Sequence, residues 1–384
     1  MGQPRVSIVI PCYRGEATIR DTLDGCLAQT YPNLEIIVVD NNSPDRSAEI
    51  AREVAAKSSK PIVVTHCATQ GAPSARNAGY EHVKGDYVQW LDADDTMDPD
   101  KIELQVAALE ADRDADIAYG DACLRFLPAG REVRVPVEAW PDQLLRMLED
   151  IWVPPHGYLL RRSAADTLQR YKAWNPTTEC SQDREYFAIG ALVGLNYRYV
   201  PGSRIAYHRW SDQQLTAGVN SVQRARAHRD MFARFRDIAK SLDPAAAAKI
   251  TDTHRLLLDQ SWDLWRLPLE SLEVQQSESG VVFVNRATGA VASRADEIAL
   301  IWQMDAAART FEAHSTRIAN WVGRLAFTTG MARRLEIPFT DESEIMAVQM
   351  CDEYPHPRAG TVAANLPVFA RLCESKMLVR EYVL

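Results

Sequence analysis

A run of aspartates that follows an apolar segment contains the residues of this sequence best suited to chemistry. In the stretch QWLDADDTMDPD, carboxylates occupy positions 92, 94, 95, 98 and 100. Carboxylates this close repel one another and raise one another's pKa, so we expect a cation to be held among them. Carboxylate oxygens are ligands that Mg²⁺ and Mn²⁺ prefer. Asp98 and Asp100 flank a proline and are typical of a helix start. Asp92 and Asp94, the Asp-x-Asp pair at the end of the apolar segment, are the cation-site candidates.

The elements that must position these carboxylates alternate regularly between strand and helix. Apolar, β-branched runs predict four strands, and segments with helical spacing separate them. The strands are expected in residues 5–11, 34–39, 61–67 and 85–95, and the helices in residues 15–31, 47–57 and 71–83. Such alternation predicts an α/β fold with a Rossmann-like, mostly parallel sheet that carries helices on both faces.

Three polar clusters fall at the carboxyl ends of the predicted strands: Pro11–Tyr13, Asp40–Asn42 and Asp92–Asp95. Ligands of open parallel sheets bind beyond this edge, so the clusters should line one site. Asp40 is placed to accept a hydrogen bond from a base or a ribose hydroxyl. Arg76, on the helix that begins in GAPSARNAG, is placed to meet a phosphate or a base.

The regular alternation ends after about residue 100, and the remaining elements are less regular. We expect a strand pair around 116–126, helices over 219–240 and 244–267, a polar linker at 274–280 and a hairpin that turns at Ala287–Gly289. These signals predict three domains with boundaries near residues 220 and 275. They are a nucleotide-binding domain over 1–220, a helical connector over 221–275 and a C-terminal accessory domain over 276–384.

The amino-acid composition and net charge of the chain argue against several classes of protein function, beginning with nucleic-acid binding. The chain has 384 residues, of which 46% are hydrophobic and 25% charged, and its formal net charge is −9. No Lys/Arg run indicates a nucleic-acid partner. The first residues lack signal-peptide features, and no apolar run of about 18 residues predicts a membrane span. Membrane association is therefore expected to be peripheral at most. The seven cysteines contain no CxxC pair, which favours a reducing cytoplasm over a disulfide framework.

Three segments together resemble the family 2 glycosyltransferases, which have the GT-A fold. They are VSIVIPCYRGEATIRDTLDGCLAQTYPNLEIIVVDNNSPD, GAPSARNAGYEHVKGDYVQWLDADD and QDREYFAIGALVG, and the likeness covers roughly residues 5–215. The resemblance implies an inverting, metal-dependent hexosyltransferase that uses a nucleotide diphosphate sugar, most simply a UDP-sugar, with Mn²⁺ or Mg²⁺. The implied nucleotide-sugar-binding residues are Pro11, Tyr13, Glu16, Asp40, Asn42, Arg76, Asp92 and Ala93. Asp94 is the implied metal ligand.

The same resemblance implies that Asp183, in SQDREYF, is the general base that deprotonates the acceptor. A carboxylate here could instead cap a helix. Gln182 replaces the glutamate that is usual in the family, and it is assigned to the acceptor side with His156 and Trp210. The family often carries a metal-binding histidine near the end of this region. His208 is the candidate, although its position in AYHRW is displaced from the usual pattern.

The C-terminal segments GVVFVNRATGAVAS and ESEIMAVQMCDEY weakly resemble PqqD-like peptide-recognition domains. Such domains bind a peptide as an added strand at a sheet edge, so the acceptor is expected to be either a glycan or a peptide. Two other functions stay open. One is a non-catalytic scaffold that binds a nucleotide sugar or a peptide, and the other is a nucleotidyltransferase. PCYRGEAT is a poor version of the phosphate loop that a nucleotidyltransferase needs.

Overall fold

The computed structural model describes residues 2–126, 131–135, 137–148, 153–209, 221–259, 272–277, 280–293 and 296. The chain forms two compact units. The first consists of Met1–Gly218 and Arg234–His254, and the second of Val219–Ala233 and Arg255–Leu384. The domain boundaries near residues 220 and 275 stay a prediction.

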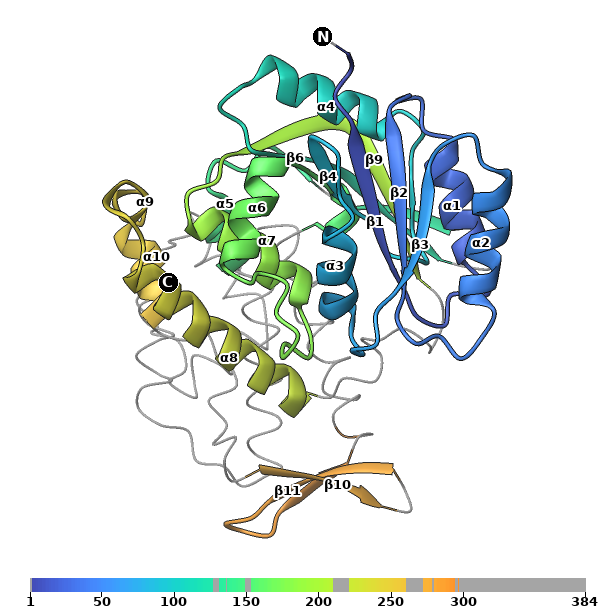
Figure 1. Cartoon of the computed structure of the whole chain (residues 1–384). Coiled ribbons are helices and arrows are strands. Elements are labelled where there is room, and N and C mark those ends of the chain that lie inside the picture. Colours follow the sequence, from blue (N-terminus) through green and yellow to red (C-terminus); the bar gives the residue numbers. More distant parts are fainter. Residues whose placement is uncertain are drawn as a thin grey trace. The chain divides into compact units, whose positions relative to one another are not determined.

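The first unit is built on one large sheet (Figure 1). In the described residues the strands of this sheet are β1 (Val6–Cys12), β2 (Leu34–Asp40), β3 (Ile62–His66), β4 (Tyr87–Trp90), β5 (Thr96–Met97), β6 (Ile117–Phe126), β7 (Arg131–Val135), β8 (Tyr158–Arg161) and β9 (Tyr197–Arg209). Their order is β3-β2-β1-β4-β8-β6-β9-β5, and β7 pairs with β6 outside this path. Strands β1 to β4 pair in parallel, and β8 is antiparallel to β4 and β6. The predicted α/β class with a mostly parallel sheet is confirmed.

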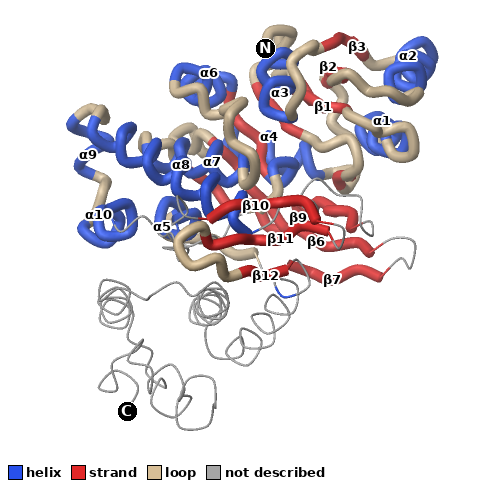
Figure 2. The backbone as a smooth tube through the Cα atoms, turned by 90° about the horizontal axis from the view of Figure 1, so that it is seen from below, coloured by secondary structure: helices blue, strands red, loops and turns tan. Residues whose placement is uncertain are grey.

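Helices cover both faces of this sheet, and Figure 2 shows α3 on one face of β1–β3 with α1 and α2 on the other. The helices described in the first unit, or partly in it, are α1 (Ile19–Leu27), α2 (Ser47–Lys57), α3 (Ala72–Tyr80), α4 (Lys101–Ala111), α5 (Gln143–Leu148), the 3₁₀ turn η1 (Pro155–Gly157), α6 (Arg162–Arg170), α7 (Gln182–Leu192), α8 (Ser221–Lys240), α9 (Pro244–Ala248) and α10 (Asp252–Asp259). Gly79 allows α3 to lie close to the sheet, since a Cβ there would stand 2.5 Å from Val9 Cγ1 and 2.8 Å from Val39 Cγ2.

Backbone hydrogen bonds join the loops that follow the parallel strands. Asn41 N donates to Cys12 O at 2.8 Å, and Cys67 N donates to Asp40 O at 2.9 Å. Leu91 N donates to Val9 O at 3.0 Å. The ladder of the sheet thus continues past the formal strand ends, and it fixes the start of each polar loop relative to its neighbour. The three polar clusters therefore follow the carboxyl ends of three adjacent strands, as predicted.

Three local predictions were wrong. Residues 117–126 form one continuous strand, β6, instead of a pair. Residues 274–277 of the expected polar linker belong to strand β10 (Leu272–Ser277), which pairs with β11 along its whole length. The helix predicted over 244–267 ends at Ala248 and a second begins at Asp252. Thr251 and His254 cap each other there, because His254 N donates to Thr251 Oγ1 at 3.2 Å and Thr251 N to His254 Nδ1 at 3.1 Å. Residues 260–267 lie outside the described part.

The second unit contains a small antiparallel sheet ordered β10-β11-β12, with β11 over Gly280–Asn285 and β12 over Val291–Ser293. The predicted hairpin is confirmed, and Gly289 at its turn has a φ of 77°. The helical segments on which the PqqD-like resemblance also depends lie outside the described residues. Among the helices that are described, none has both the length and the apolar character needed to cross a membrane.

Candidate active site

The loop Asp92–Asp95 is a tight turn that leaves β4 and leads into β5. Asp95 N donates to Asp92 O at 3.2 Å, which closes the turn, and Thr22 Oγ1 donates to Ala93 O at 2.9 Å. The chain then pairs with β9 through Thr96 and Met97. Because the loop is held at both ends and in its middle, its aspartates have fixed and different surroundings.

Asp94 lies in surroundings that are unfavourable for a negative charge. Burial first and the neighbouring Asp92 second raise the pKa of Asp94 from 3.8 to about 6. Loss of water around Asp94 and repulsion from the Asp92 charge both disfavour the ionised form of Asp94. A bound divalent cation would offset both effects, and these hard oxygen donors suit Mg²⁺ or Mn²⁺. The residues present therefore fit a divalent metal of this class.

Arg76 pairs with Asp92 from the neighbouring helix α3. The distance between Arg76 Nη2 and Asp92 Oδ1 is 2.5 Å, and the exposed fractions of the two side chains are 5% and 29%. The guanidinium also stacks over the ring of Trp174 at 4.2 Å from the centroid. A stacked, paired guanidinium has little freedom to rotate. Arg76 therefore fixes the orientation of Asp92, and its predicted contact with the nucleotide stays a prediction.

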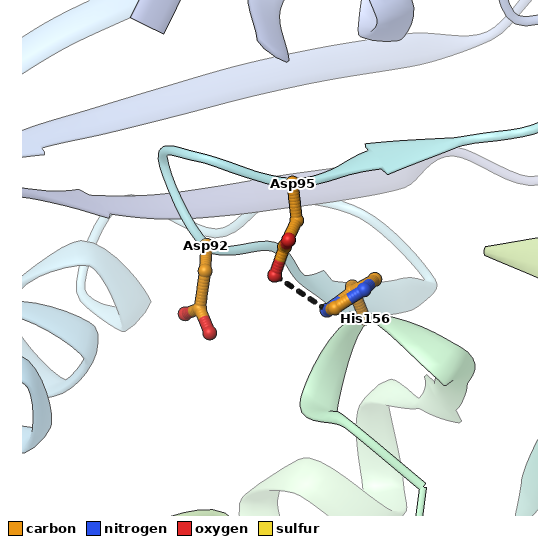
Figure 3. Close-up of side chains that lie close together, drawn as sticks. All are labelled: Asp92, Asp95 and His156. Carbon is orange, nitrogen blue, oxygen red and sulfur yellow. Dashed lines mark ion pairs between the residues drawn. The ribbon is translucent and has the colours of Figure 1, made fainter. Parts of the chain in front are cut away.

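Asp95 and His156 form a buried pair behind the loop, and Figure 3 shows the imidazole facing the Asp95 carboxylate. His156 Nδ1 lies 3.4 Å from Asp95 Oδ2, and neither side chain is exposed. His208 N donates to Asp95 Oδ1 at 2.7 Å. Burial lowers the pKa of His156 to about 3, so its imidazole is neutral at physiological pH. Asp95 thus joins the loop to both η1 and β9.

In the described residues the cluster able to hold a metal differs from the predicted one. Donor atoms of Asp92, Asp95 and His156 lie within 4.8 Å of one another, whereas Asp94 and His208 were the predicted ligands. Sequence reasoning placed Asp95 in the acidic run without a role and His156 on the acceptor side. The acceptor-side role of His156 stays a prediction, and the described ring is fully buried.

The His208 side chain also lies near the Asp92–Asp95 loop, and it contacts Thr96 and Arg125. Its Nε2 lies 3.3 Å from Thr96 Oγ1 and 3.5 Å from an Arg125 nitrogen. Burial, followed by the charge of Arg125, lowers the pKa of His208, which favours the neutral ring that a metal ligand requires. Its role as a metal ligand stays a prediction. Trp210, assigned to the acceptor side, lies outside the described residues.

The predicted base-binding end of the site lies where β1 and β2 end. Tyr13 has an exposed fraction of 39%, which is high for a large apolar side chain in this unit, and the Arg14 guanidinium lies 5.2 Å from its ring centroid. Pro11 is half-buried at the strand end. Asp40 is buried, and its Oδ1 accepts a hydrogen bond from Ser43 N at 3.2 Å. The exposed ring and the adjacent carboxylate are suited to stacking on a base and accepting its hydrogen bonds.

Glu16 and Asn42, two other nucleotide candidates, hold loops together in this structure. Glu16 Oε2 accepts from Arg46 N at 3.3 Å, close to the first turn of α2. Asn42 Nδ2 donates to Ala68 O at 2.8 Å, and Asn42 Oδ1 lies 2.9 Å from His66 Nε2. Asn42 has a left-handed backbone with a φ of 59°. Both side chains therefore have structural partners, and their contact with a nucleotide stays a prediction.

Asp183 is the second residue of α7, in the positive first turn of that helix. The next residue, Arg184, is buried and donates to Met147 O at 2.7 Å and Leu148 O at 2.9 Å. Burial lowers the pKa of Arg184 to about 9. Gln182 Nε2 donates to Thr178 O at 2.8 Å, so this amide supports the loop before the helix. The assignment of Asp183 as the base stays a prediction.

Sequence reasoning missed two features of this region. Trp174 supports Arg76 from a loop with no recognisable motif, and only the folded chain brings the two together. Buried Glu185 forms an ion pair at 2.5 Å with the partly exposed Arg234. The signal for Glu185 was present in SQDREYF as a carboxylate beside apolar residues, but nothing local indicates its partner.

Comparison with known sequences supports the resemblance. Residues 7–135 match the family described as Glycosyl transferase family 2. An uncharacterised glycosyltransferase of Haemophilus influenzae is 37% identical over 106 residues, which is 28% of this chain and 42% of that protein. The glycosyltransferase GlyA of Streptococcus pneumoniae is 33% identical over 117 residues, which is 30% of this chain and 16% of GlyA. The matched region thus spans less than half the length of these relatives.

Solved structures extend the likeness in fold. S. aureus TarS residues 1–349 align with a TM-score of 0.52 at 17% identity, over 86% of this chain and 91% of that one. The mannosyltransferase PcManGT of Pyrobaculum calidifontis, in complex with GDP-Man and Mn²⁺, aligns with a TM-score of 0.54 at 18% identity, over 88% of both chains. At this low sequence identity, the alignments support a shared fold and nothing further. The family match over residues 7–135 and these structural alignments together support a region similar to the family 2 glycosyltransferases, with the GT-A fold.

Proposed function

We propose that this chain is an inverting, metal-dependent glycosyltransferase that transfers a hexosyl group from a UDP-sugar to a glycan or peptide acceptor. One observation carries the proposal: Asp92 and Asp94 share a rigid loop beside the ends of β1 and β2, where Tyr13 and Asp40 lie. A nucleotide stacked at Tyr13 would direct its diphosphate toward this loop. The same edge of the sheet would then hold both the base and the leaving group.

The residues have separable tasks in this mechanism. Tyr13 and Asp40 bind the base, and Arg76 holds Asp92 toward the ribose. Asp94, with His208, is the proposed metal ligand, and bound Mg²⁺ or Mn²⁺ would stabilise the leaving diphosphate. Asp183 takes the proton from the acceptor hydroxyl or amide while the new bond to the sugar's anomeric carbon forms. The bond from that carbon to the diphosphate oxygen breaks on the opposite face, which inverts the configuration.

The choice of donor is supported by the nucleotides bound in solved structures of similar fold. TarS has been solved with UDP and with UDP-GlcNAc, and PcManGT with GDP-Man and Mn²⁺. Proteins of this fold therefore bind either nucleotide class. We favour a UDP-sugar because the family motifs around Tyr13 and Asp40 are associated with uracil. A cytoplasmic location, predicted from the cysteine pattern, is part of the same proposal.

The acceptor is proposed from the second unit. Its described sheet is a three-stranded meander in which β10 and β12 are the outer strands. An outer strand can pair with an extended peptide, which is the reason to include a peptide beside a glycan. In this scheme the accessory domain over 276–384 supplies acceptor affinity, and the catalytic residues supply the chemistry.

Slow hydrolysis of the donor tests the proposal without knowledge of the acceptor. The chain is incubated with Mn²⁺ and UDP-glucose, UDP-GlcNAc or GDP-mannose, and the released nucleoside diphosphate is measured. Asp94→Asn should lose both metal-dependent nucleotide binding and turnover. Asp183→Asn should keep donor binding and lose about 10²–10⁴-fold in turnover. Asp100→Asn, an exposed aspartate outside the loop, is the matched control.

The outcomes separate the competing functions. Binding of a nucleotide sugar without release by any variant would favour the non-catalytic scaffold. Neither binding nor release with any of the three donors would count against the donor site as a whole. Equal loss of donor binding in Asp94→Asn and Asp183→Asn would make Asp183 a structural carboxylate.

A further inference from the structure

A partly buried ion pair joins α7, the helix of Asp183, to α8. Arg234 Nη1 lies 2.5 Å from Glu185 Oε1, and the exposed fractions of the two side chains are 22% and 0%. Glu185 Oε2 also accepts a hydrogen bond from Thr178 Oγ1 at 2.5 Å. Removing a carboxylate from water is costly unless partners surround it. Both Glu185 oxygens are accounted for, so this carboxylate has one well-defined position.

Arg234 also binds the segment that follows α6. Its Nη2 donates to Tyr171 O at 2.6 Å and to Lys172 O at 2.5 Å. Lys172 has a left-handed backbone with a φ of 49°, so the chain reverses sharply at this point. A guanidinium presents several donors in one plane, and a single side chain can hold several acceptors in fixed relative positions. Arg234 therefore fixes the end of α6 relative to α7.

Glu185 lies two residues after Asp183 on the same helix, so its contacts limit the freedom of the helix start. The loop before α7 folds back onto this carboxylate through Thr178, and Gln182 Nε2 returns to Thr178 O. On the other side, Arg184 binds the carbonyls that end α5. The first turn of α7 is thus held from two directions, and the Glu185 contact depends on Arg234.

We infer that Arg234, acting through Glu185, is a positioning residue for Asp183. The inference rests on the proposed role of Asp183 as the general base. Arg234 lies outside residues 7–135, which carry the family match, and on a helix whose first residues group with the second unit. The assigned role therefore belongs to a part of the chain that the family match does not cover.

A double-mutant cycle tests the inference. Arg234→Met is made in the wild-type and Asp183→Asn backgrounds, and hydrolysis is measured with Mn²⁺ and UDP-GlcNAc or GDP-mannose, whichever the wild type turns over. A base displaced by about 1 Å can lower the rate on the order of 10²-fold. We expect a drop of about 10- to 100-fold in kcat in the wild-type background, less than about twofold in the Asp183→Asn background, and an unchanged Kd for the donor.

Lys240→Met is the control, because it removes an exposed ion pair with Asp237 from the same helix. Should Arg234→Met fail to fold by thermal melting, Arg234→Lys replaces it, since a single ammonium nitrogen then stands in for the two guanidinium nitrogens that hold Glu185 and the Tyr171 and Lys172 carbonyls apart. An equal kcat loss in both backgrounds, or no loss in either, overturns the inference. Full activity of Asp183→Asn alone refutes the base assignment and the inference with it, and this result is visible without any change at Arg234.

Discussion

The pair formed by Arg76 and Asp92 gives the sharpest test of how the acidic loop is held. Arg76→Met removes a guanidinium that is 2.5 Å from Asp92 Oδ1 and 4.2 Å from the Trp174 ring centroid. The remaining Asp92 charge would then face Asp94, whose pKa is already raised to about 6. The variant should therefore lose both a stabilising contact and the neutralisation of one carboxylate.

The magnitude follows from the surroundings of the pair. A hydrogen bond to a charged group contributes about 1.5–3 kcal/mol, and a desolvated cation–π contact about 2 kcal/mol. Breaking a fully buried pair costs about 3–5 kcal/mol, but Asp92 is 29% exposed, so the lower part of this range applies. We expect Arg76→Met to lower the free energy of unfolding of the first unit by about 3 kcal/mol.

A double-mutant cycle with Asp92→Asn isolates the interaction. In the Arg76→Met background, Asp92→Asn removes an unpaired charge and should restore about 2 kcal/mol. In the wild type the same change loses the partner of Arg76 and relieves Asp94, so its net effect should be small. Urea unfolding followed by tryptophan fluorescence gives the four free energies. A coupling energy below about 0.5 kcal/mol would refute the reasoning, because it would mean that the two side chains act independently.

Three further predictions concern the metal site, helix packing and a buried lysine. Mn²⁺ and UDP together should raise the melting temperature more than either does alone, with about 2.7 kcal/mol of stabilisation at a hundredfold excess over Kd; this synergy should disappear in Asp94→Asn. Gly79→Ala should destabilise the first unit by about 1–3 kcal/mol because its Cβ would clash with β1 and β2, whereas Gly25→Ala, where a Cβ has no neighbour closer than 3.7 Å, should be neutral or stabilising; paired thermal melts compare them. Burial lowers the pKa of Lys101 well below 10.5, so the unfolded chain binds the extra proton and stability should rise with pH up to about 10.4, by at most about 1.4 kcal/mol per pH unit. Lys101→Met should flatten this rise in urea unfolding between pH 6.5 and 8.5, and parallel profiles for the two proteins would show that Lys101 does not titrate in that window.

The errors of sequence reasoning have identifiable causes. The break between α9 and α10 comes from reciprocal capping by Thr251 and His254, a local signal that the apolar periodicity obscured. The sequence pattern over 274–280 favoured a linker because most of its residues are polar, yet polar residues are compatible with a strand whose backbone pairs with a neighbour, as that of β10 does with β11. In both cases the relevant information was in the sequence, but it was weaker than the competing signal.

The sequence alone determined the four parallel strands β1 to β4, the helices between them and the edge of the sheet at which the polar clusters gather. Those features depend on the spacing of apolar residues and on short polar motifs, which act locally. Only the tertiary structure decided how the carboxylates of the Asp92–Asp95 loop differ. Asp92 meets Arg76 on α3, Asp94 is half-buried beside Asp92, and Asp95 joins His156 to His208. Identical side chains acquire different partners and pKa values because segments far apart in the sequence close around each one, and that closure is a property of the whole fold.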